Sequence, residues 1–393
     1  MMAPTINPPR NVPRRGGIRL DWVIVGLVST ILLLGLVMVT SASITMAARD
    51  NAAPFLYLER QLALVLFGLL AAALIFCVPT ARLERLALPL LLLAGVLSLA
   101  VLVPGLGHVV NGSRRWLRLG PINFQVSELV RVLVLIYIAH YCVRFEAALR
   151  SGLQGVLRPL LLLGLAAVLL LLEPDLGAGA VLFLTGFGLL FLGGAQIRWV
   201  ALTLLTGAGA LVALVMLSPY RMRRIMAFLD PWADPYNGGF QLVQSLIAIG
   251  RGQWFGVGLG ASVQKLFYLP EAHNDFLFAV LAEELGLVGV VATLGLFLAL
   301  VWRVFALAQR AHSAGLKFQA YLAAGFGLWL GLQAFVNIGV NMGVLPTKGL
   351  TLPLMSYGRS SLIVTLAWLG VILRVHHDTV SSARAPLVRE RAA

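Results

Sequence analysis

Long apolar runs recur along almost the whole of this 393-residue chain, and they constrain its fold more than any other feature. Each run is close to the roughly 17–25 residues that a helix needs to cross a bilayer. Hydrophobic residues make up 60% of the chain and charged residues 12%, too little charge to cover the exterior of a soluble domain. The sequence therefore predicts an all-α polytopic membrane protein with about ten transmembrane helices, near residues 22–45, 60–78, 86–104, 127–145, 158–173, 177–194, 198–217, 275–303, 319–343 and 355–375.

The chain divides into one large membrane domain and two short polar ends. We expect a basic, disordered head at residues 1–18, a transmembrane domain at 19–375 and an unstructured tail at 376–393, with both ends in the cytoplasm. A long segment, 218–274, separates the seventh and eighth helices, and we expect it outside the cytoplasm. A connection of that length in a compact protein is usually functional. Within it, residues 240–249 mix polar with apolar side chains, which favours a helix at the membrane interface.

Lysine and arginine indicate the orientation, since the cytoplasmic loops of membrane proteins collect positive charge. With the amino terminus in the cytoplasm, three basic clusters remain on the outer side: Arg114, Arg115 and Arg118; Arg221, Arg223, Arg224, Arg251 and Lys265; and Lys348 with Arg359. An anionic lipid headgroup such as a diphosphate would explain them, because cations near the interface pair readily with phosphate. For any single arginine, solvated surface charge is an equally good explanation. The net charge of +14 thus indicates membrane and phosphate rather than nucleic acid, for which no groove-reading module is visible.

The segment Leu269-Pro-Glu-Ala-His-Asn-Asp-Phe276 carries three ionisable side chains immediately before an apolar run. That run, residues 276–304, reads as a membrane helix, so Asp275 should lie at the rim of the bilayer. A carboxylate there can reach both water-borne chemistry and a lipid-borne substrate. A plainer role is helix capping, because Asp and Asn are preferred at the N-cap, and either Asn274 or Asp275 could fill it.

Other charged residues fall within the expected helices. Glu128 and Arg131 are three residues apart on one helix, a spacing that suits an ion pair bracing the bundle. Glu283 and Glu284 lie about two turns beyond Asp275 along the expected helix. Either of them could be a buried structural partner or a neutral acid.

Several motifs, most of them in the second half of the chain, match one known family. They are Arg221-Met-Arg-Arg-Ile225, Phe228-Leu-Asp-Pro-Trp232, Trp254-Phe-Gly-Val-Gly-Leu-Gly260, Ser262-Val-Gln-Lys-Leu266, the 269–276 segment, Ala282-Glu-Glu-Leu-Gly286 and Leu345-Pro-Thr-Lys-Gly-Leu-Thr-Leu-Pro353. Together they resemble the shape, elongation, division and sporulation (SEDS) family of peptidoglycan glycosyltransferases, from Asp21 to Arg374 and closer to its division branch than to its elongation branch. Three positions depart from the family pattern: Arg131 replaces a lysine, Asn274 a threonine and Arg359 a glycine.

The resemblance implies a reaction and assigns residues to it. It implies an enzyme that polymerises lipid II into glycan strands at the outer face of the bacterial cytoplasmic (inner) membrane, at the division septum. Asp275 becomes the general base for the hydroxyl of the acceptor sugar. The expected substrate-binding residues are Lys348, Arg114, Arg115, Arg221, Arg224, Lys265, His273, Glu271, Ser356 and Ser360.

The resemblance also implies partners. We expect a class B penicillin-binding protein that cross-links the new strands, other division membrane proteins, and lipid II with the growing glycan strand as ligands. A divalent cation, Mg²⁺ or Mn²⁺, could stabilise the leaving diphosphate, although the sequence shows no metal-ligand spacing. No organic cofactor is expected.

Two other functions fit parts of the same pattern. A lipid II flippase also needs many helices, a cationic outer cavity and buried acids such as Glu283 and Glu284. It gains nothing, however, from a carboxylate at the outer rim. A non-catalytic scaffold for division proteins needs none of these polar residues.

Overall fold

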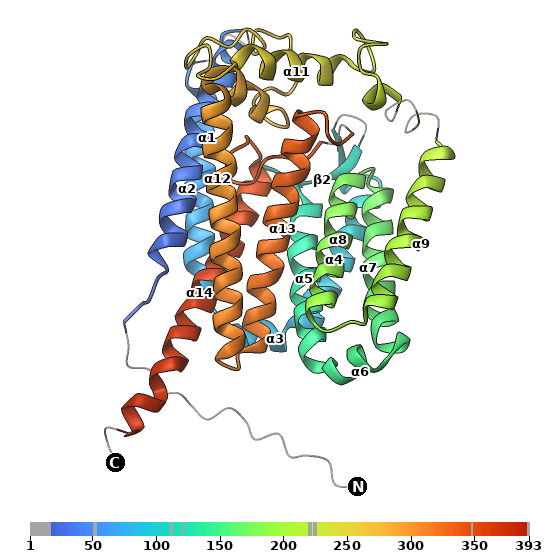
Figure 1. The fold of residues 1–393 in the computed structure, drawn as a ribbon, viewed down its shortest axis with the longest axis vertical. Coiled ribbons are helices and arrows are strands. Elements are labelled where there is room, and N and C mark those ends of the chain that lie inside the picture. Colours follow the sequence, from blue (N-terminus) through green and yellow to red (C-terminus); the bar gives the residue numbers. More distant parts are fainter. Residues whose placement is uncertain are drawn as a thin grey trace.

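The structure, a computed structural model, describes residues 17–49, 53–110, 113–119, 122–218, 222, 226–346 and 349–390. Ten long helices form the body of this part of the chain (Figure 1). They are α1 (Trp22–Arg49), α2 (Leu56–Phe76), α4 (Ala87–Leu102), α5 (Val126–Arg144), α7 (Leu153–Leu172), α8 (Leu176–Leu192), α9 (Ile197–Met216), α12 (Leu277–Ser313), α13 (Lys317–Asn341) and α14 (Arg359–Glu390). Three shorter helices are α3 (Thr80–Arg85), α6 (Glu146–Ser151) and α11 (Phe240–Gly252).

The predicted helical membrane fold is confirmed, and each of the ten predicted segments overlaps one of the long helices. Seven helices within the described residues are long and apolar enough to cross a membrane. Helices α4 and α8 and the first part of α9 (Ile197–Gly207) are apolar but shorter. The protein is therefore an integral membrane protein, while the number of ten crossings stays a prediction.

The two ends of the bundle differ (Figure 1). Helix α11 runs across one end, within the long connection between α9 and α12, where the sequence predicted a helix at residues 240–249. Helices α3 and α6 lie at the other end. The backbone N of Arg19, just before α1, donates a hydrogen bond to Nδ1 of His377 in α14 at 3.3 Å. Residues near both ends of the chain thus lie on one side of the bundle.

A small sheet interrupts the helical pattern where the sequence predicted only a loop. Strands β1 (Gly107–Val110), β2 (Ser113–Leu119) and β3 (Ile122–Gln125) form an antiparallel sheet in the order β1–β2–β3. β-branched and aromatic residues such as Val109 and Trp116 favour strands. The Asn111-Gly112 dipeptide is the strongest short-range signal for a hairpin. Arg114 and Arg115 therefore lie on strand β2 and not in a loop.

The expected unstructured tail is also wrong for the residues that the structure describes. Helix α14 continues without interruption to Glu390. Nε of Arg374 lies 2.9 Å from Oδ1 of Asp378, and pairs four residues apart stabilise a helix. The hydroxyl of Thr80 donates to the other oxygen of Asp378 at 2.7 Å, which ties this part of α14 to α3.

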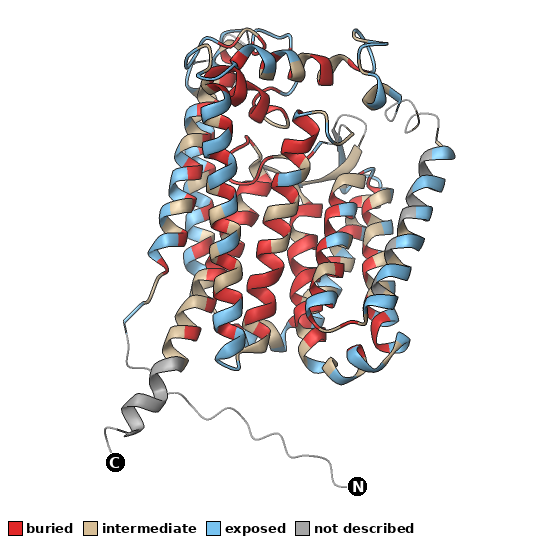
Figure 2. Ribbon diagram, viewed as in Figure 1, coloured by how far each residue is buried: buried red, intermediate tan, exposed pale blue. Residues whose placement is uncertain are grey.

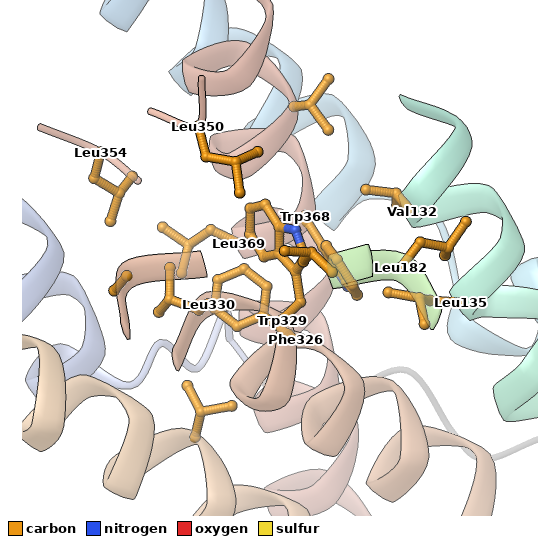
Figure 3. Packing of buried hydrophobic residues seen from close by; sticks show 14 of the residues in the cluster. Val132, Leu135, Leu182, Phe326, Trp329, Leu330, Leu350, Leu354, Trp368 and Leu369 are labelled. Carbon is orange, nitrogen blue, oxygen red and sulfur yellow. The ribbon is translucent and has the colours of Figure 1, made fainter. Parts of the chain in front are cut away.

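Helices α5, α13 and α14 form the centre of the bundle, since most of their residues are buried (Figure 2). Helices α1, α2 and α12 keep large apolar surfaces, which suits contact with lipid tails. An aromatic cluster joins α13 to α14: the ring centroids of Trp329 and Trp368 lie 5.2 Å apart, and those of Phe326 and Trp368 lie 5.4 Å apart (Figure 3). The core thus includes two helices, α5 and α14, that reach the cavity described below.

Small residues let α2 and α14 approach each other closely, a common way for membrane helices to pack. A Cβ on Gly370 of α14 would lie 2.3 Å from the carbonyl oxygen of Ala72 in α2. A Cβ on Gly68 of α2 would lie 2.5 Å from Leu366 of α14. Larger side chains at these two positions would push the helices apart. The contact therefore fixes α14, whose first turn forms part of the cavity wall.

Candidate active site

A polar cavity of about 370 Å³ opens between the sheet, the start of α5, the segment before α12 and the start of α14. A volume of this size falls in the range of small-molecule sites. The wall consists of Arg115, Trp116, Asn123, Gln125, Glu128, Glu271, His273, Asn274, Asp275, Gly349, Leu350, Thr351, Tyr357, Gly358, Arg359, Ser360 and Ser361. Stretches of chain that are far apart in the sequence meet there, and many of them contribute polar or charged groups.

Asp275 presents a free carboxylate to this cavity. Among the described residues, none forms a hydrogen bond or an ion pair with its side chain, which lines the wall. Its backbone carbonyl, by contrast, accepts hydrogen bonds from Nδ2 of Asn337 at 2.9 Å and from Nδ2 of Asn341 at 3.0 Å. Helix α13 thus holds the backbone of Asp275 while leaving the carboxylate for a ligand.

The capping role considered for Asn274 and Asp275 is not formed. Helix α12 begins at Leu277 with Phe276 as its N-cap, and no side chain caps its first turn. The amide nitrogen of Asn274 lies 3.4 Å from a carboxylate oxygen of Glu271 instead. The plainer explanation for an Asp at this position is therefore wrong.

The surroundings of Asp275 favour its neutral form. Burial and, to a smaller extent, the neighbouring Glu271 carboxylate raise the pKa of Asp275 to about 7, against the opposing effect of Arg115. Burial lowers the pKa of His273, and Glu271 opposes that change. A carboxyl group with a pKa near 7 can accept a proton efficiently at neutral pH.

The sheet brings Arg115 to the cavity, and a carboxylate outside the cavity partly neutralises it. NH1 of Arg115 lies 3.4 Å from Oδ2 of Asp175. The same oxygen accepts hydrogen bonds from Ser127 Oγ at 3.0 Å and from Gln125 Nε2 at 3.1 Å. Oδ1 of Asp175 accepts from the backbone N of Ala178 at 3.0 Å and so caps α8. This network holds Arg115 in place on the wall.

Arg359, the first residue of α14, places a second cation on the wall. Its guanidinium carbon lies 6.0 Å from the ring centroid of Tyr357, and no described carboxylate forms an ion pair with it. The first backbone N–H groups of a helix have no partner within the helix and carry its positive dipole end. Arg359 and the start of α14 together favour an anionic group of a ligand.

Five of the predicted catalytic and substrate-binding residues meet in the cavity. They are Arg115, Glu271, His273, Asp275 and Ser360. Three others, Lys348, Arg221 and Arg224, lie outside the described residues.

The remaining three predicted substrate-binding residues contact other parts of the protein. An amino group of Arg114 lies 3.3 Å from the last carbonyl of α4. Oγ of Ser356 accepts a hydrogen bond from the backbone N of Leu352 at 3.0 Å. Nζ of Lys265 is buried and lies 2.8 Å from a carboxylate oxygen of Glu284. The structure therefore does not bring Arg114, Ser356 or Lys265 to the cavity.

Glu128 and Arg131 form an ion pair within α5. Arg131 is fully buried, and its NH1 donates to Oε1 of Gln333 in α13 at 2.9 Å. Its guanidinium also lies 5.8 Å from the ring centroid of Trp329. Because Glu128 lines the cavity, the pair connects the cavity wall to the centre of the bundle.

No motif in the sequence predicts the cluster of three aromatic rings at the site. The rings of Tyr57, His273 and Tyr357 contact one another with centroids 5.4 to 5.6 Å apart. Tyr57 belongs to α2, and no local pattern links it to the other two rings. Asn123 and Gln125 were missed because the strand that carries them was not predicted, and a recognised hairpin could have revealed them.

No protein metal cage is visible in the described part of the chain. Within it, no group of three or more His, Cys, Asp or Glu side chains is arranged to hold a metal ion. Mg²⁺ is often bound by one or two carboxylates together with substrate phosphates. A cation in this cavity would therefore have to share oxygens with a bound ligand.

The fold and the cavity define a class: a helical integral membrane protein whose polar pocket holds two cations and a carboxylate without a partner among the described residues. The family model of the FtsW, RodA and SpoVE cell cycle proteins matches residues 21–381, and the chain belongs to this family. The family resemblance found in the sequence motifs is confirmed.

Relatives and solved structures cover nearly the whole chain. A probable peptidoglycan glycosyltransferase FtsW from Thioalkalivibrio sulfidiphilus is 57% identical over 364 residues, which cover 93% of this chain and 91% of the relative. A protein of the same name from Coxiella burnetii is 49% identical, with 91% and 96% covered. A chain from the structure of a peptidoglycan synthase complex that coordinates polymerization and crosslinking is 36% identical with a TM-score of 0.74, covering 92% of this chain and 99% of that chain. Thermus thermophilus RodA is 36% identical with a TM-score of 0.68, covering 91% and 97%.

Asp275→Asn should stabilise the folded protein at neutral and alkaline pH. The folded protein holds the Asp275 proton more tightly than the unfolded chain, because the pKa is raised to about 7 from its ordinary value of 3.8. The stability linked to this proton is present below the unfolded pKa and is lost as pH rises through the folded pKa. Melting temperatures of variant and parent should therefore agree near about pH 4 and diverge toward about pH 8, with the variant higher. Parallel melting curves over that range would contradict the raised pKa.

Proposed function

We propose that this protein is a peptidoglycan glycosyltransferase that polymerises lipid II into glycan strands, with Asp275 as its general base. Relatives that are about half identical over nearly the whole chain carry the name of that activity. The observation that carries the residue-level proposal is the free carboxylate of Asp275, which shares a cavity with Arg115 and Arg359.

The proposed reaction joins two sugars and releases a lipid diphosphate. The 4-hydroxyl oxygen of the acceptor sugar forms a bond to the anomeric carbon of the donor sugar. The bond from that carbon to the diphosphate oxygen breaks, and the diphosphate keeps the electron pair. The hydroxyl proton passes to the ionised carboxylate of Asp275, a type of step that contributes about 10²–10⁴-fold in rate. One base is sufficient, because a diphosphate leaves without needing a proton.

Negative charge grows on the diphosphate as it leaves, and cations placed for that charge lower the barrier. Arg359 is free of described carboxylate partners, and Arg115 shares its charge with Asp175. Guanidinium groups bind phosphate oxygens through two parallel hydrogen bonds. We therefore assign Arg359 and Arg115 to the diphosphate. Lys348, Arg221 and Arg224 remain proposed substrate contacts on the strength of the family motifs.

The two rival functions explain less of this geometry. A proton-coupled flippase would use Glu283 and Glu284 as titrating acids, yet these carboxylates are paired with Arg251 and Lys265. A scaffold needs no free carboxylate in a polar cavity. Fluorescent lipid II separates the three: glycan chains indicate the enzyme, headgroup transfer without chains indicates the flippase, and neither indicates the scaffold.

The cellular setting is part of the proposal. A similar chain comes from a peptidoglycan synthase complex that coordinates polymerization and crosslinking. We propose a class B penicillin-binding transpeptidase as the partner of this protein, together with other division membrane proteins. The location is the bacterial cytoplasmic membrane at the septum, with both termini in the cytoplasm and the cavity at the outer face. The contact between Arg19 and His377 supports termini on one side of the membrane.

A divalent cation is a further proposed component. Mg²⁺ or Mn²⁺ would bind oxygens of the diphosphate and at most one or two cavity carboxylates, since the described residues form no cage. Removal of divalent cations with EDTA should then slow lipid II polymerisation, and added Mg²⁺ should restore it. Full activity in EDTA would exclude the cation from the reaction.

Asp275→Asn should lower the rate of lipid II polymerisation by about 100-fold or more, because the amide cannot accept the proton. The parent enzyme should lose about tenfold per pH unit below the pKa of about 7, as Asp275 becomes protonated. Gel analysis of glycan chains made by purified protein measures both effects.

The matched control for this substitution is Asp230→Asn. Asp230 lies on the exposed connection between α9 and α11, and its Oδ1 accepts from the backbone N of Ala233, a bond that an amide oxygen also accepts. Its activity should equal that of the parent. An Asp275→Asn protein as active as Asp230→Asn would exclude Asp275 as the base.

Arg359→Gly should weaken the use of lipid II by raising KM about tenfold, which corresponds to the loss of about 1.4 kcal/mol of binding. Glycine is the residue that the family pattern has at this position, so the start of α14 should still form. Arg118→Gly is the control, because Arg118 is exposed on strand β2 and does not line the cavity. Equal KM values for the two variants would exclude Arg359 from the diphosphate site.

A further inference from the structure

Asp275 lies just before a short helical stretch that ends at a break in α12. Residues 277–285 are helical, and Gly286 then takes φ 65° and ψ −163°, outside the helical range. The expected continuous helix through this region is therefore wrong. Glu283 and Glu284 occupy the last turn before the break, and both are buried. The contacts that they make extend to the segment that leads to Asp275.

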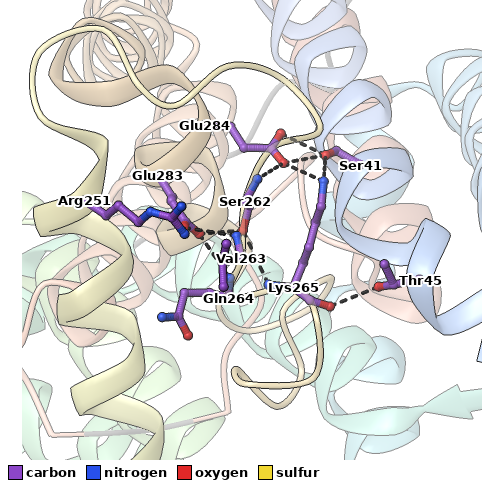
Figure 4. A network of polar contacts seen from close by, with 9 residues as sticks. All are labelled: Ser41, Thr45, Arg251, Ser262, Val263, Gln264, Lys265, Glu283 and Glu284. Atoms are coloured by element: carbon purple, nitrogen blue, oxygen red, sulfur yellow. Dashed lines mark hydrogen bonds and ion pairs between the residues drawn. The ribbon is translucent and has the colours of Figure 1, made fainter.

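Glu283 connects the stretch to the loop before it and to α11 (Figure 4). Its carboxylate accepts hydrogen bonds from Ser262 Oγ at 2.5 Å, from the backbone N of Val263 at 3.1 Å and from that of Gln264 at 3.4 Å. It also pairs with NH1 of Arg251, the last arginine of α11, at 3.1 Å. One carboxylate thus joins the short stretch to two parts of the long connection.

Glu284 connects the same loop to α1 (Figure 4). Its Oε1 lies 2.8 Å from Nζ of Lys265 and 2.7 Å from the hydroxyl of Ser41, which donates to it. Nζ of Lys265 also donates to Oγ of Ser41 at 2.9 Å, and the hydroxyl of Thr45 donates to the carbonyl of Lys265 at 3.0 Å. We call Ser41, Arg251, Ser262, Lys265, Glu283 and Glu284 the glutamate clamp.

The backbone around the clamp is packed just as closely. The backbone N of Val257 donates to the carbonyl of Glu283 at 2.9 Å, and that of Gly258 donates to the carbonyl of Glu284 at 3.1 Å. A Cβ on Gly256 would lie 2.1 Å from the carbonyl oxygen of Glu284. The loop and the end of the short stretch therefore form one unit, while Asn337 and Asn341 hold the other end at Asp275.

A buried network of this kind could serve only to stabilise the fold. Ion pairs taken out of water, however, often add little net stability compared with apolar packing, and some of them specify one arrangement instead. Here the loop holds Gln253, Phe267 and Glu271 at φ values of 46°, 69° and 56°. Such conformations persist only where the surroundings impose them. The clamp holds this loop through Ser262 and Lys265 and supplies fixed contacts to it.

We propose that Glu283 and Glu284 are positioning residues for glycosyl transfer: paired with Arg251 and Lys265, they hold segment 253–276 against α1 and α12 so that Asp275 faces the cavity. This inference rests on the proposed function of Asp275. The two glutamates do not touch the cavity themselves, since neither is among its lining residues.

Glu284→Gln in the full-length purified protein tests this inference. It should lower kcat for lipid II polymerisation by about tenfold or more, because a misplacement of about 1 Å at a catalytic group can reduce the rate about 100-fold. KM should change by less than about twofold, since the diphosphate contacts are untouched. The acid limb of the pH–rate profile should also move, because it reports the surroundings of Asp275. Lys265→Arg keeps the charge and should retain more activity than Lys265→Met.

Asp21→Asn is the matched control. Asp21 is a buried carboxylate paired with Arg303 at 2.9 Å, at the opposite end of the bundle. Its loss should lower the melting temperature without moving the pH–rate profile or kcat per folded molecule. If Glu284→Gln behaves like Asp21→Asn, the clamp only stabilises the fold and the proposal is overturned.

Hydrogen exchange supplies a measurement that does not depend on activity. In Glu284→Gln, peptides from segment 253–276 should exchange faster, while α13 and α14 should keep the exchange of the parent. Ser41→Ala removes one clamp contact and gives a milder variant if Glu284→Gln does not fold. Unchanged exchange in the segment overturns the proposal. If exchange is faster in Glu284→Gln but the Asp275→Asn protein is active, the role of Asp275 alone is overturned.

Discussion

The break in helix α12 at Gly286 determines where the carboxylate of Asp275 can lie. Gly286 has φ 65° and ψ −163°, and a Cβ there would lie 2.3 Å from the backbone N of Gly256, so only glycine fits. A continuous helix would align the residues after Asp275 with the long part of α12. The helix breaks there, and Asp275, just before the short stretch, lines one cavity with the sheet and the start of α14 while α13 holds its backbone. The cavity therefore depends on a local change of backbone direction as much as on its polar side chains.

The distribution of charge around the cavity follows from this arrangement. Charges within a membrane protein are expensive and are normally paired. Most buried carboxylates near the site follow that rule, as Glu128 does with Arg131 and Glu284 with Lys265. Within the described residues, Asp275 lacks such a partner, as does the Arg359 side chain that faces the same space. Among the described residues, a base and a cation without ion-pair partners in one cavity match a reaction that transfers a proton from a sugar hydroxyl while a diphosphate leaves.

Much of this architecture could be predicted from the sequence, and the failures have identifiable physical causes. The ten long helices follow from apolar runs, because a bilayer selects strongly for such runs. The sheet was not predicted, although Asn111-Gly112 marks a hairpin. Without the sheet, the sequence could not separate Arg115, which reaches the cavity, from Arg114, which does not. Neighbouring residues in a strand project to opposite faces, and the structure brings only Arg115 to the cavity. Lys265 is one of the expected outer cations, and no local pattern shows its burial, because its partners Ser41 and Glu284 lie in other elements. The break at Gly286 is hidden inside an apolar run.

The central claim is that the Asp275 carboxylate accepts the proton of the acceptor hydroxyl, and chemical rescue tests it most directly. Asp275→Ala removes the carboxylate and leaves room for a small anion in a cavity of about 370 Å³. Formate then supplies a free carboxylate at the same place. The account predicts that Asp275→Ala is inactive in lipid II polymerisation and recovers activity in proportion to added formate, while the parent is unaffected. A folded Asp275→Ala protein that polymerises lipid II at the parental rate without formate would contradict it.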